Sequence, residues 1–117
     1  MNNNSEDCDS RRTQRICELN DQFRTSLNGG AVLFTAGIVA LGAKLEVNIL
    51  DAVRVFNDFN QDNDPFGDHD FGSFEVAGHK VIFKIDYFDV HRAQHSPDPA
   101  DSDVTERVMT IMLAGEW

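Results

Sequence analysis

The stretch GSFEVAGHKVIFKIDYFDV, residues 72–90, contains the pattern that decides the fold. One side of its second half is apolar, at Val81, Phe83, Ile85 and Tyr87. The side chains between them are mixed, at Ile82, Lys84, Asp86 and Phe88. This period of two is typical of an antiparallel strand with one covered face. A turn at residues 77–79 separates it from a preceding strand, so the sequence predicts a β-hairpin.

Two helices are predicted before this hairpin. From about Asp9, apolar residues recur at spacings of three and four and form one stripe, at Ile16, Leu19, Phe23 and Leu27. The Asn28-Gly29-Gly30 run is a strong stop signal for that helix. A second amphipathic helix is predicted over residues 43–59, with Leu45, Ile49, Val53 and Phe56 on one face.

Two further strands complete the predicted sheet. The first half of AVLFTAGIVAL (residues 31–41) reads as a buried strand, and TERVMTIMLAGEW (105–117) supplies the last one. The order helix, strand, helix, three strands predicts an α+β fold, with two helices packed on one face of a mainly antiparallel sheet of about four strands. The length of 117 residues predicts a single domain over 1–117, with a flexible tail over residues 1–8.

The composition indicates in which compartment the protein is expected and whether a membrane is an expected partner. No segment approaches the ~18 apolar residues that span a bilayer, and the first residues lack the pattern of a secretory signal. Cys8 and Cys17, nine residues apart, would lie on opposite faces of one helix, so we do not expect them to pair. We therefore expect a cytoplasmic protein without a membrane partner.

Charge is the strongest global signal. The net charge is −10, and residues 56–117 hold thirteen acidic and four basic residues, a net of −9. Such a surface repels nucleic acid and attracts basic surfaces over about a Debye length. No direct binding of nucleic acid is expected, and a protein with a basic nucleic-acid-binding surface is the expected partner.

The segment DFNQDNDPFGDHDFGSF (58–74) concentrates this charge, with five aspartates among four phenylalanines. A calcium loop of the EF-hand kind starting at Asp62 would have Phe66 at its fifth position and Ser73 at its twelfth, where oxygen ligands are required. A start at Asn60 fails as well, because Pro65 replaces the required glycine. The sequence predicts neither a metal ion nor a cofactor.

Catalytic residues are not predicted either. Asp68, His69 and Asp70 are adjacent, and neighbours in an extended chain point to different sides. No cysteine–histidine or serine–histidine pair stands out as a nucleophile. His91 and His95 have the spacing of zinc ligands on a helix, but they run directly into a proline-rich loop.

An ordered acidic surface is the preferred interpretation of the segment. Asp64-Pro65-Phe66-Gly67 has the composition of a β-turn, and Phe66, Phe71 and Phe74 are spaced to anchor the loop on the core. Carboxylates at i and i+2 of an extended segment face one side about 6.6 Å apart and resemble a phosphate backbone. The predicted partner-binding residues are Asp58, Asp62, Asp64, Asp68, Asp70, Asp98, Asp101 and Asp103.

Several motifs together resemble a family of small proteins of unknown function that is common in alphaproteobacteria, their plasmids and their phages. They are NDQFR (20–24), TAGI (35–38), DNDPFGDHDFG (62–72), FKIDYFD (83–89) and SPDPADSDVTERVMTIMLAGEW (96–117). The resemblance implies one compact domain and transfers no catalytic residues. By analogy with other small acidic proteins of mobile elements, it suggests a non-enzymatic inhibitor of a host defence complex, of the anti-CRISPR or anti-restriction type.

Two alternatives stay open at this point. One is a small metal-dependent enzyme or metal-binding protein that uses the Asp58–Asp70 cluster. The other is a housekeeping protein-interaction module. The oligomeric state is not predicted.

Overall fold

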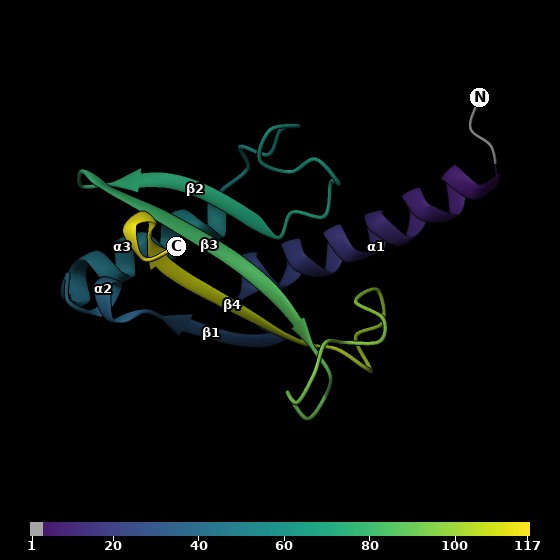
Figure 1. The fold of residues 1–117 in the computed structure, drawn as a ribbon. Helices are drawn as coiled ribbons and strands as arrows, with labels where there is room; N and C mark the ends of the chain where they lie inside the picture. The colour runs from purple at the N-terminus through teal and green to yellow at the C-terminus, as the bar shows by residue number, and fades with distance from the viewer. Residues whose placement is uncertain (1–3) are drawn as a thin grey trace.

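The computed structural model describes the backbone of residues 4–117 and the side chains from Ser10 onward. Its elements are α1 (Asn4–Ser26), β1 (Gly30–Phe34), α2 (Ala36–Val39), α3 (Ala43–Val55), β2 (Phe71–Val76), β3 (His79–Phe88), β4 (Glu106–Leu113) and a 3₁₀ turn at Ala114–Glu116 (Figure 1). Of the tail predicted over residues 1–8, residues 1–3 lie outside the described part, and α1 is helical from Asn4.

The four strands form one mixed sheet in the order β1-β4-β3-β2. The predicted hairpin is confirmed, because β2 and β3 pair antiparallel around Ala77 and Gly78. β3 also pairs antiparallel with β4, whereas β1 runs parallel to β4, with Gly30 opposite Arg107. The predicted α+β fold with a mainly antiparallel sheet is therefore confirmed, and the parallel edge strand is an addition to it.

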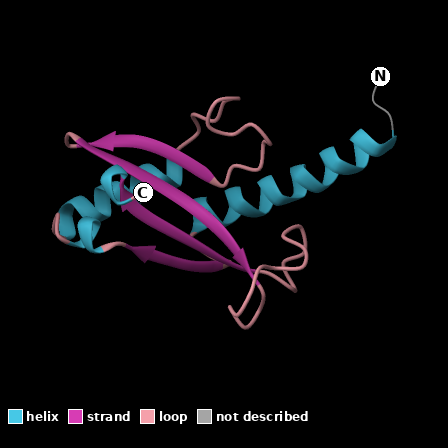
Figure 2. Cartoon of the chain, in the orientation of Figure 1, coloured by secondary structure: helices cyan, strands magenta, loops and turns pink. Residues whose placement is uncertain are grey.

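One face of the sheet carries the core. Phe83 of β3 lies opposite Ile111 of β4, and Ile85 lies opposite Met109, so these four side chains point to the same side. α1 contributes Phe23 to this cluster, and α3 contributes Ile49 and Val53. The helices cover this face of the sheet (Figure 2) because their apolar stripes can be buried only against it.

The helix boundaries differ from the predicted ones for local reasons. α3 ends at Val55 rather than at residue 59, because Phe56 adopts an extended conformation (φ −59°, ψ 131°). The Phe56 ring then packs edge-on against Phe83 at 5.4 Å between centroids. The short helix α2 was not predicted, since its four residues are too few to show a helical period.

Two loops lie at the same end of the sheet, where β3 ends and where β2 and β4 begin (Figure 1). They cover residues 56–70 and 89–105, and both contact α1. Asn20 of α1 donates to the Asp68 carbonyl at 2.9 Å, and Arg12 pairs with Asp98 at 2.9 Å. α1 is thereby placed against both acidic loops.

Candidate functional site

The loop over residues 56–70 is folded by its own polar side chains. The Asn60 Oδ1 atom accepts hydrogen bonds from the backbone N–H groups of Asp62 and Asn63, at 2.9 and 3.1 Å. Asn63 Nδ2 donates to the Asp58 carbonyl at 2.8 Å. The predicted β-turn forms, with Gly67 N–H donating to the Asp64 carbonyl at 3.1 Å. The loop is a series of turns and not an extended strand.

The prediction that aromatic side chains anchor the loop on the core is partly correct. Phe74 packs against the core cluster, and Phe71 contacts Trp117 at 5.4 Å between ring centroids. Phe66 is not an anchor, because it is 80% exposed at the tip of the turn. Phe59 takes that role instead, and its ring stacks on His69 at 3.8 Å between centroids and 5° between planes.

The eight predicted aspartates divide into three groups. Four are exposed: Asp58, Asp62, Asp101 and Asp103. Asp98 is half-buried and pairs with Arg12. The remaining three are partly buried and converge, with one carboxylate oxygen from each lying within 4.8 Å of the others: Asp64, Asp68 and Asp70.

This convergence corrects one geometric expectation. The row of outward carboxylates at i and i+2 over residues 62–70 does not form, since that spacing holds only in an extended chain. Asp62 points to solvent, while the Asp64 side chain is only 6% exposed and accepts the His69 N–H at 3.1 Å. The backbone reversal at His69, with φ 59°, then brings Asp68 and Asp70 back toward Asp64.

A buried polar network supports this loop from below. Asn20 of α1 is fully buried and donates from Nδ2 to the Asp68 carbonyl at 2.9 Å and to the Tyr87 hydroxyl at 2.8 Å. Its Oδ1 accepts a hydrogen bond from Arg107 Nε at 2.7 Å. The Tyr87 hydroxyl donates in turn to Asp70 Oδ2 at 3.1 Å. One asparagine therefore links α1, β3, β4 and the acidic loop.

Burial shifts the pKa values of ionisable groups in this network. Burial, followed by the neighbouring charge of Asp68, raises the pKa of Asp70. Burial and the Asp70 carboxylate raise the pKa of Tyr87 above its ordinary range. The phenol therefore remains protonated and serves as a hydrogen-bond donor to Asp70.

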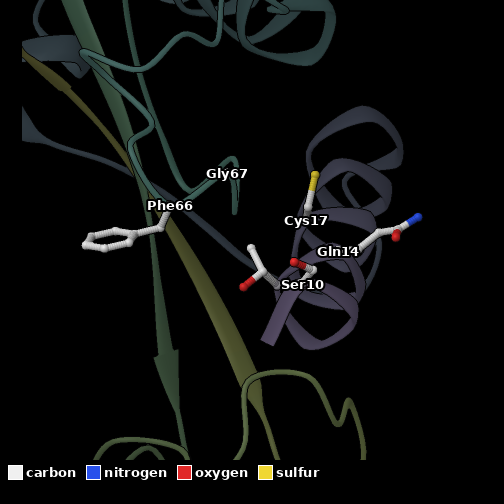
Figure 3. Close-up of a pocket in the computed structure, with 6 residues that line it drawn as sticks. Ser10, Gln14, Cys17, Phe66 and Gly67 are labelled. Atoms are coloured by element: carbon white, nitrogen blue, oxygen red, sulfur yellow. The ribbon is translucent and has the colours of Figure 1, made fainter. Parts of the chain in front are cut away.

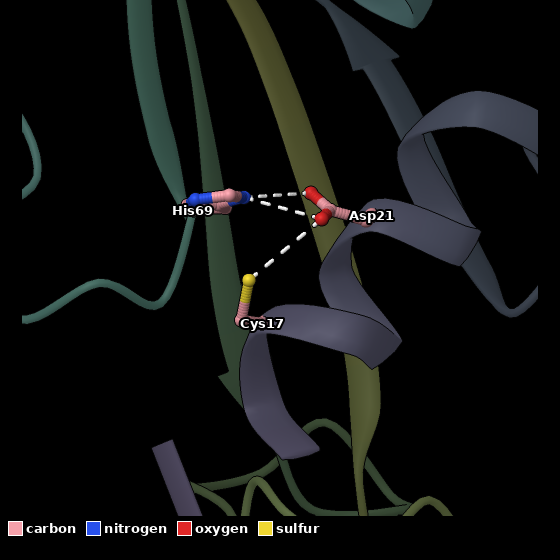
Figure 4. Close-up of side chains that lie close together, drawn as sticks. All are labelled: Cys17, Asp21 and His69. Carbon is pink, nitrogen blue, oxygen red and sulfur yellow. Dashed lines mark hydrogen bonds and ion pairs between the residues drawn. The ribbon is translucent and has the colours of Figure 1, made fainter. Parts of the chain in front are cut away.

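A second cluster joins α1 to the same loop through Cys17, Asp21 and His69 (Figure 4). His69 Nδ1 lies 3.0 Å from Asp21 Oδ1 and 3.2 Å from Oδ2, and the Cys17 Sγ lies 3.7 Å from Asp21 Oδ2. Burial and the charge of Asp21 raise the pKa of Cys17 to about 12, so the free thiol is protonated at neutral pH.

Sequence reasoning missed this cluster. Cys17 and Asp21 are four residues apart on one helix, which places them on one face, and that part of the pattern was visible. His69 lies 48 residues further along the chain from Asp21, and only the packing of the loop on α1 brings it there. The histidine pair at 91 and 95 that had zinc spacing is exposed and does not form such a cluster among the described residues.

A shallow groove beside Cys17 separates α1 from the turn of the acidic loop (Figure 3). It is lined by Ser10, Thr13, Gln14, Cys17, Phe66 and Gly67.

None of the helices in the described part of the chain has the length and apolar character that a membrane span requires.

The fold and these clusters define an α+β protein whose acidic loop is held on its first helix. The family model "Protein of unknown function (DUF3768)" matches residues 34–116, and the chain belongs to that family. The matched residues include the whole acidic loop and the last three strands. No curated protein and no solved structure gave a match.

Proposed function

We infer that this protein is a cytoplasmic, non-enzymatic binding protein that occupies a basic nucleic-acid-binding surface of a protein partner. The partner class that we propose is a host complex that targets nucleic acid, and the protein would act as its inhibitor, encoded by a plasmid or phage. The net charge of −9 on residues 56–117 and the motif resemblance described above support this proposal.

The observation that carries the proposal is the exposed tip of the acidic loop. Phe66 is 80% exposed there, and Asp58 and Asp62 are exposed on the same loop. Aromatic residues, Phe among them, are enriched in protein interfaces, whose rims are polar. Nearby carboxylates increase the association rate with a basic surface and make it depend on salt.

The second acidic loop contributes a separate set of charges. Asp101 and Asp103 are exposed, and the Asp101 side chain accepts the Asp103 N–H at 2.9 Å, which fixes the turn. The three converging aspartates, by contrast, are partly buried. They add negative potential behind the tip but offer little contact area, so we assign the direct contacts to the four exposed aspartates and Phe66.

Affinity purification from the native host, followed by identification of the co-eluting protein, provides the partner for the test. Binding of that partner is then measured for D58N/D62N, for D101N/D103N and for F66A. A control, D51N/E75Q, removes the same number of exposed charges from α3 and β2. We expect the first three variants to bind the partner at least about tenfold more weakly than the wild type does. The affinity of the wild type should fall as salt is added. Equal binding by all four variants would contradict the proposal.

The convergence of Asp64, Asp68 and Asp70 favours a second candidate, a protein that binds a hard divalent cation with this cluster. Oxygen ligands are preferred by magnesium, calcium and manganese. Calorimetric titration with each of these ions separates the two candidates. Micromolar binding that is lost in D68N/D70N would support the second one.

A further inference from the structure

The cluster of Cys17, Asp21 and His69 has the donor set of a zinc site. Thiolate, imidazole and carboxylate are the three protein donors that zinc uses. Two of them come from successive turns of α1, and the third comes from the acidic loop (Figure 4). The side chains come from different elements, yet one donor atom from each lies within 4.8 Å of the others.

Two of the three separations between donor atoms are close to those of tetrahedral zinc. With Zn–N and Zn–O distances of about 2.0–2.1 Å and a Zn–S distance of about 2.3 Å, tetrahedral angles place N and O about 3.3 Å apart and S and O about 3.5 Å apart. The observed separations from Asp21 Oδ2 are 3.2 Å to His69 Nδ1 and 3.7 Å to Cys17 Sγ. Oδ2 therefore lies close to both other donors, whereas Oδ1, at 3.0 Å from His69 Nδ1, is also bound by Arg24.

The surroundings of the cluster are those of a metal site as well. A histidine that binds a metal usually directs its other ring nitrogen to a carboxylate, which fixes the ring. Here His69 Nε2 lies 3.5 Å from Oδ2 of Asp64, a side chain only 6% exposed. Phe59 stacks flat on the same imidazole and restricts its rotation.

Arg24 fixes the carboxylate in the same way. Its guanidinium is 4% exposed and donates to Asp21 Oδ1 at 2.9 Å, which leaves Oδ2 directed toward the thiol and the imidazole. The charge around the cluster also suits a cation. The Cys17 thiolate, Asp21 and Asp64 are negative, and Asp68 and Asp70 converge with Asp64, so a zinc ion and Arg24 would offset part of this charge.

We propose that Cys17, Asp21 and His69 bind a zinc ion through Sγ, Oδ2 and Nδ1, with Asp64 and Arg24 as the groups that orient two of these ligands. Water from the groove beside Cys17 completes the coordination. Binding releases the thiol proton to solvent, since zinc takes up the thiolate. The ion would join the acidic loop to α1, and this proposal is independent of the partner-binding function.

Calorimetry with zinc chloride on the full chain tests the proposal, and cobalt(II) absorption reports on the ligands. We expect one zinc per chain, proton release and a cobalt spectrum with a thiolate charge-transfer band. D64N should lose about ten- to a hundredfold in affinity, because it removes only an orienting group. C17A and H69Q remove ligands and should lose more than D64N.

Two control variants locate the site. C8A removes the other cysteine and H91Q/H95Q removes two other histidines, and both should bind zinc like the wild type. Circular dichroism confirms that each variant is folded, and C17S replaces C17A if the alanine variant is not. Failure of the wild type to bind zinc below about 100 μM, or unchanged affinity in the Cys17 and His69 variants, would overturn the proposal.

Discussion

Arg107 Nε donates to the amide oxygen of Asn20 at 2.7 Å, and both side chains are buried. The two residues are 87 positions apart, on β4 and α1. Arg107 has a second acceptor in the Pro99 carbonyl, and its guanidinium lies over the Tyr87 ring at 5.2 Å. This contact holds the first helix against the end of the sheet from which both acidic loops emerge.

Removal of the Asn20 amide should therefore destabilise the protein strongly. In N20A the Nε of Arg107, the Asp68 carbonyl and the Tyr87 hydroxyl each lose a partner in a buried site. We expect a loss of about 2–4 kcal/mol in the free energy of unfolding, measured by urea denaturation. Q22A, at an exposed position of the same helix, should change it by about 0.5 kcal/mol or less. A similar cost for both variants would show that the network is not the cause.

We expect substitution of Arg24 to destabilise the protein as strongly, even when lysine replaces it. Its Nη1 atom donates to the carbonyls of Val53 and Phe56 at 3.0 and 2.8 Å, where α3 ends. Lysine has no planar fork and cannot bind these carbonyls and Asp21 together. We expect R24K to lower the midpoint of thermal unfolding, with a cost of about 2–4 kcal/mol.

The same exchange at Arg54 is the matched control. Arg54 is exposed and donates from Nε to the Thr25 carbonyl at 2.9 Å. R54K should cost about 1 kcal/mol or less. If R54K were as harmful as R24K, burial at the end of α3 would not explain the effect.

Gly72 should tolerate no side chain. A Cβ atom at this buried position of β2 would overlap the Phe83 ring and lie 2.8 Å from the Phe56 ring. G72A should destabilise the protein by about 1–3 kcal/mol in chemical denaturation, because two core rings must move. At Gly115 a Cβ atom would meet nothing within 4 Å, so G115A should be nearly neutral.

The raised pKa of Asp70 predicts a pH effect of definite sign. The folded protein holds the proton on Asp70 more tightly than the unfolded chain does, so this group stabilises the fold at low pH. That contribution is lost as the pH rises through the folded-state pKa. The stability of D70N relative to wild type should therefore increase as the pH rises above about 4, the ordinary pKa of an aspartate.

Thermal unfolding of both proteins across this range measures the effect. Asparagine keeps an oxygen that can accept the Tyr87 hydroxyl, so the hydrogen bond is retained. D103N removes an exposed carboxylate and serves as the control, which should not reproduce the D70N effect. A D70N difference that moves in the opposite direction would contradict the assignment of burial and carboxylate repulsion to Asp70.

The sequence by itself determined the α+β class, the hairpin over residues 71–88 and the two main helices. Each of these is a local property, because alternation and helical spacing follow from the backbone geometry of a few successive residues. Local patterns could not predict the short helix α2 or the end of α3, where Arg24 of α1 binds the last carbonyls. The parallel pairing of β1 with β4 was also beyond it, since a strand pattern gives no direction.

Only the tertiary structure decided which charged residues act together. The sequence identified the Asp58–Asp70 segment as unusual, but its turns divide the aspartates into an exposed pair and a converging trio. Asp21 meets His69, and Asn20 meets Arg107, through contacts 48 and 87 residues apart. Such contacts depend on how a helix seats on a sheet, which no local period encodes. The helices and strands could therefore be predicted from the sequence, whereas the clusters of interacting side chains form only when these elements pack together.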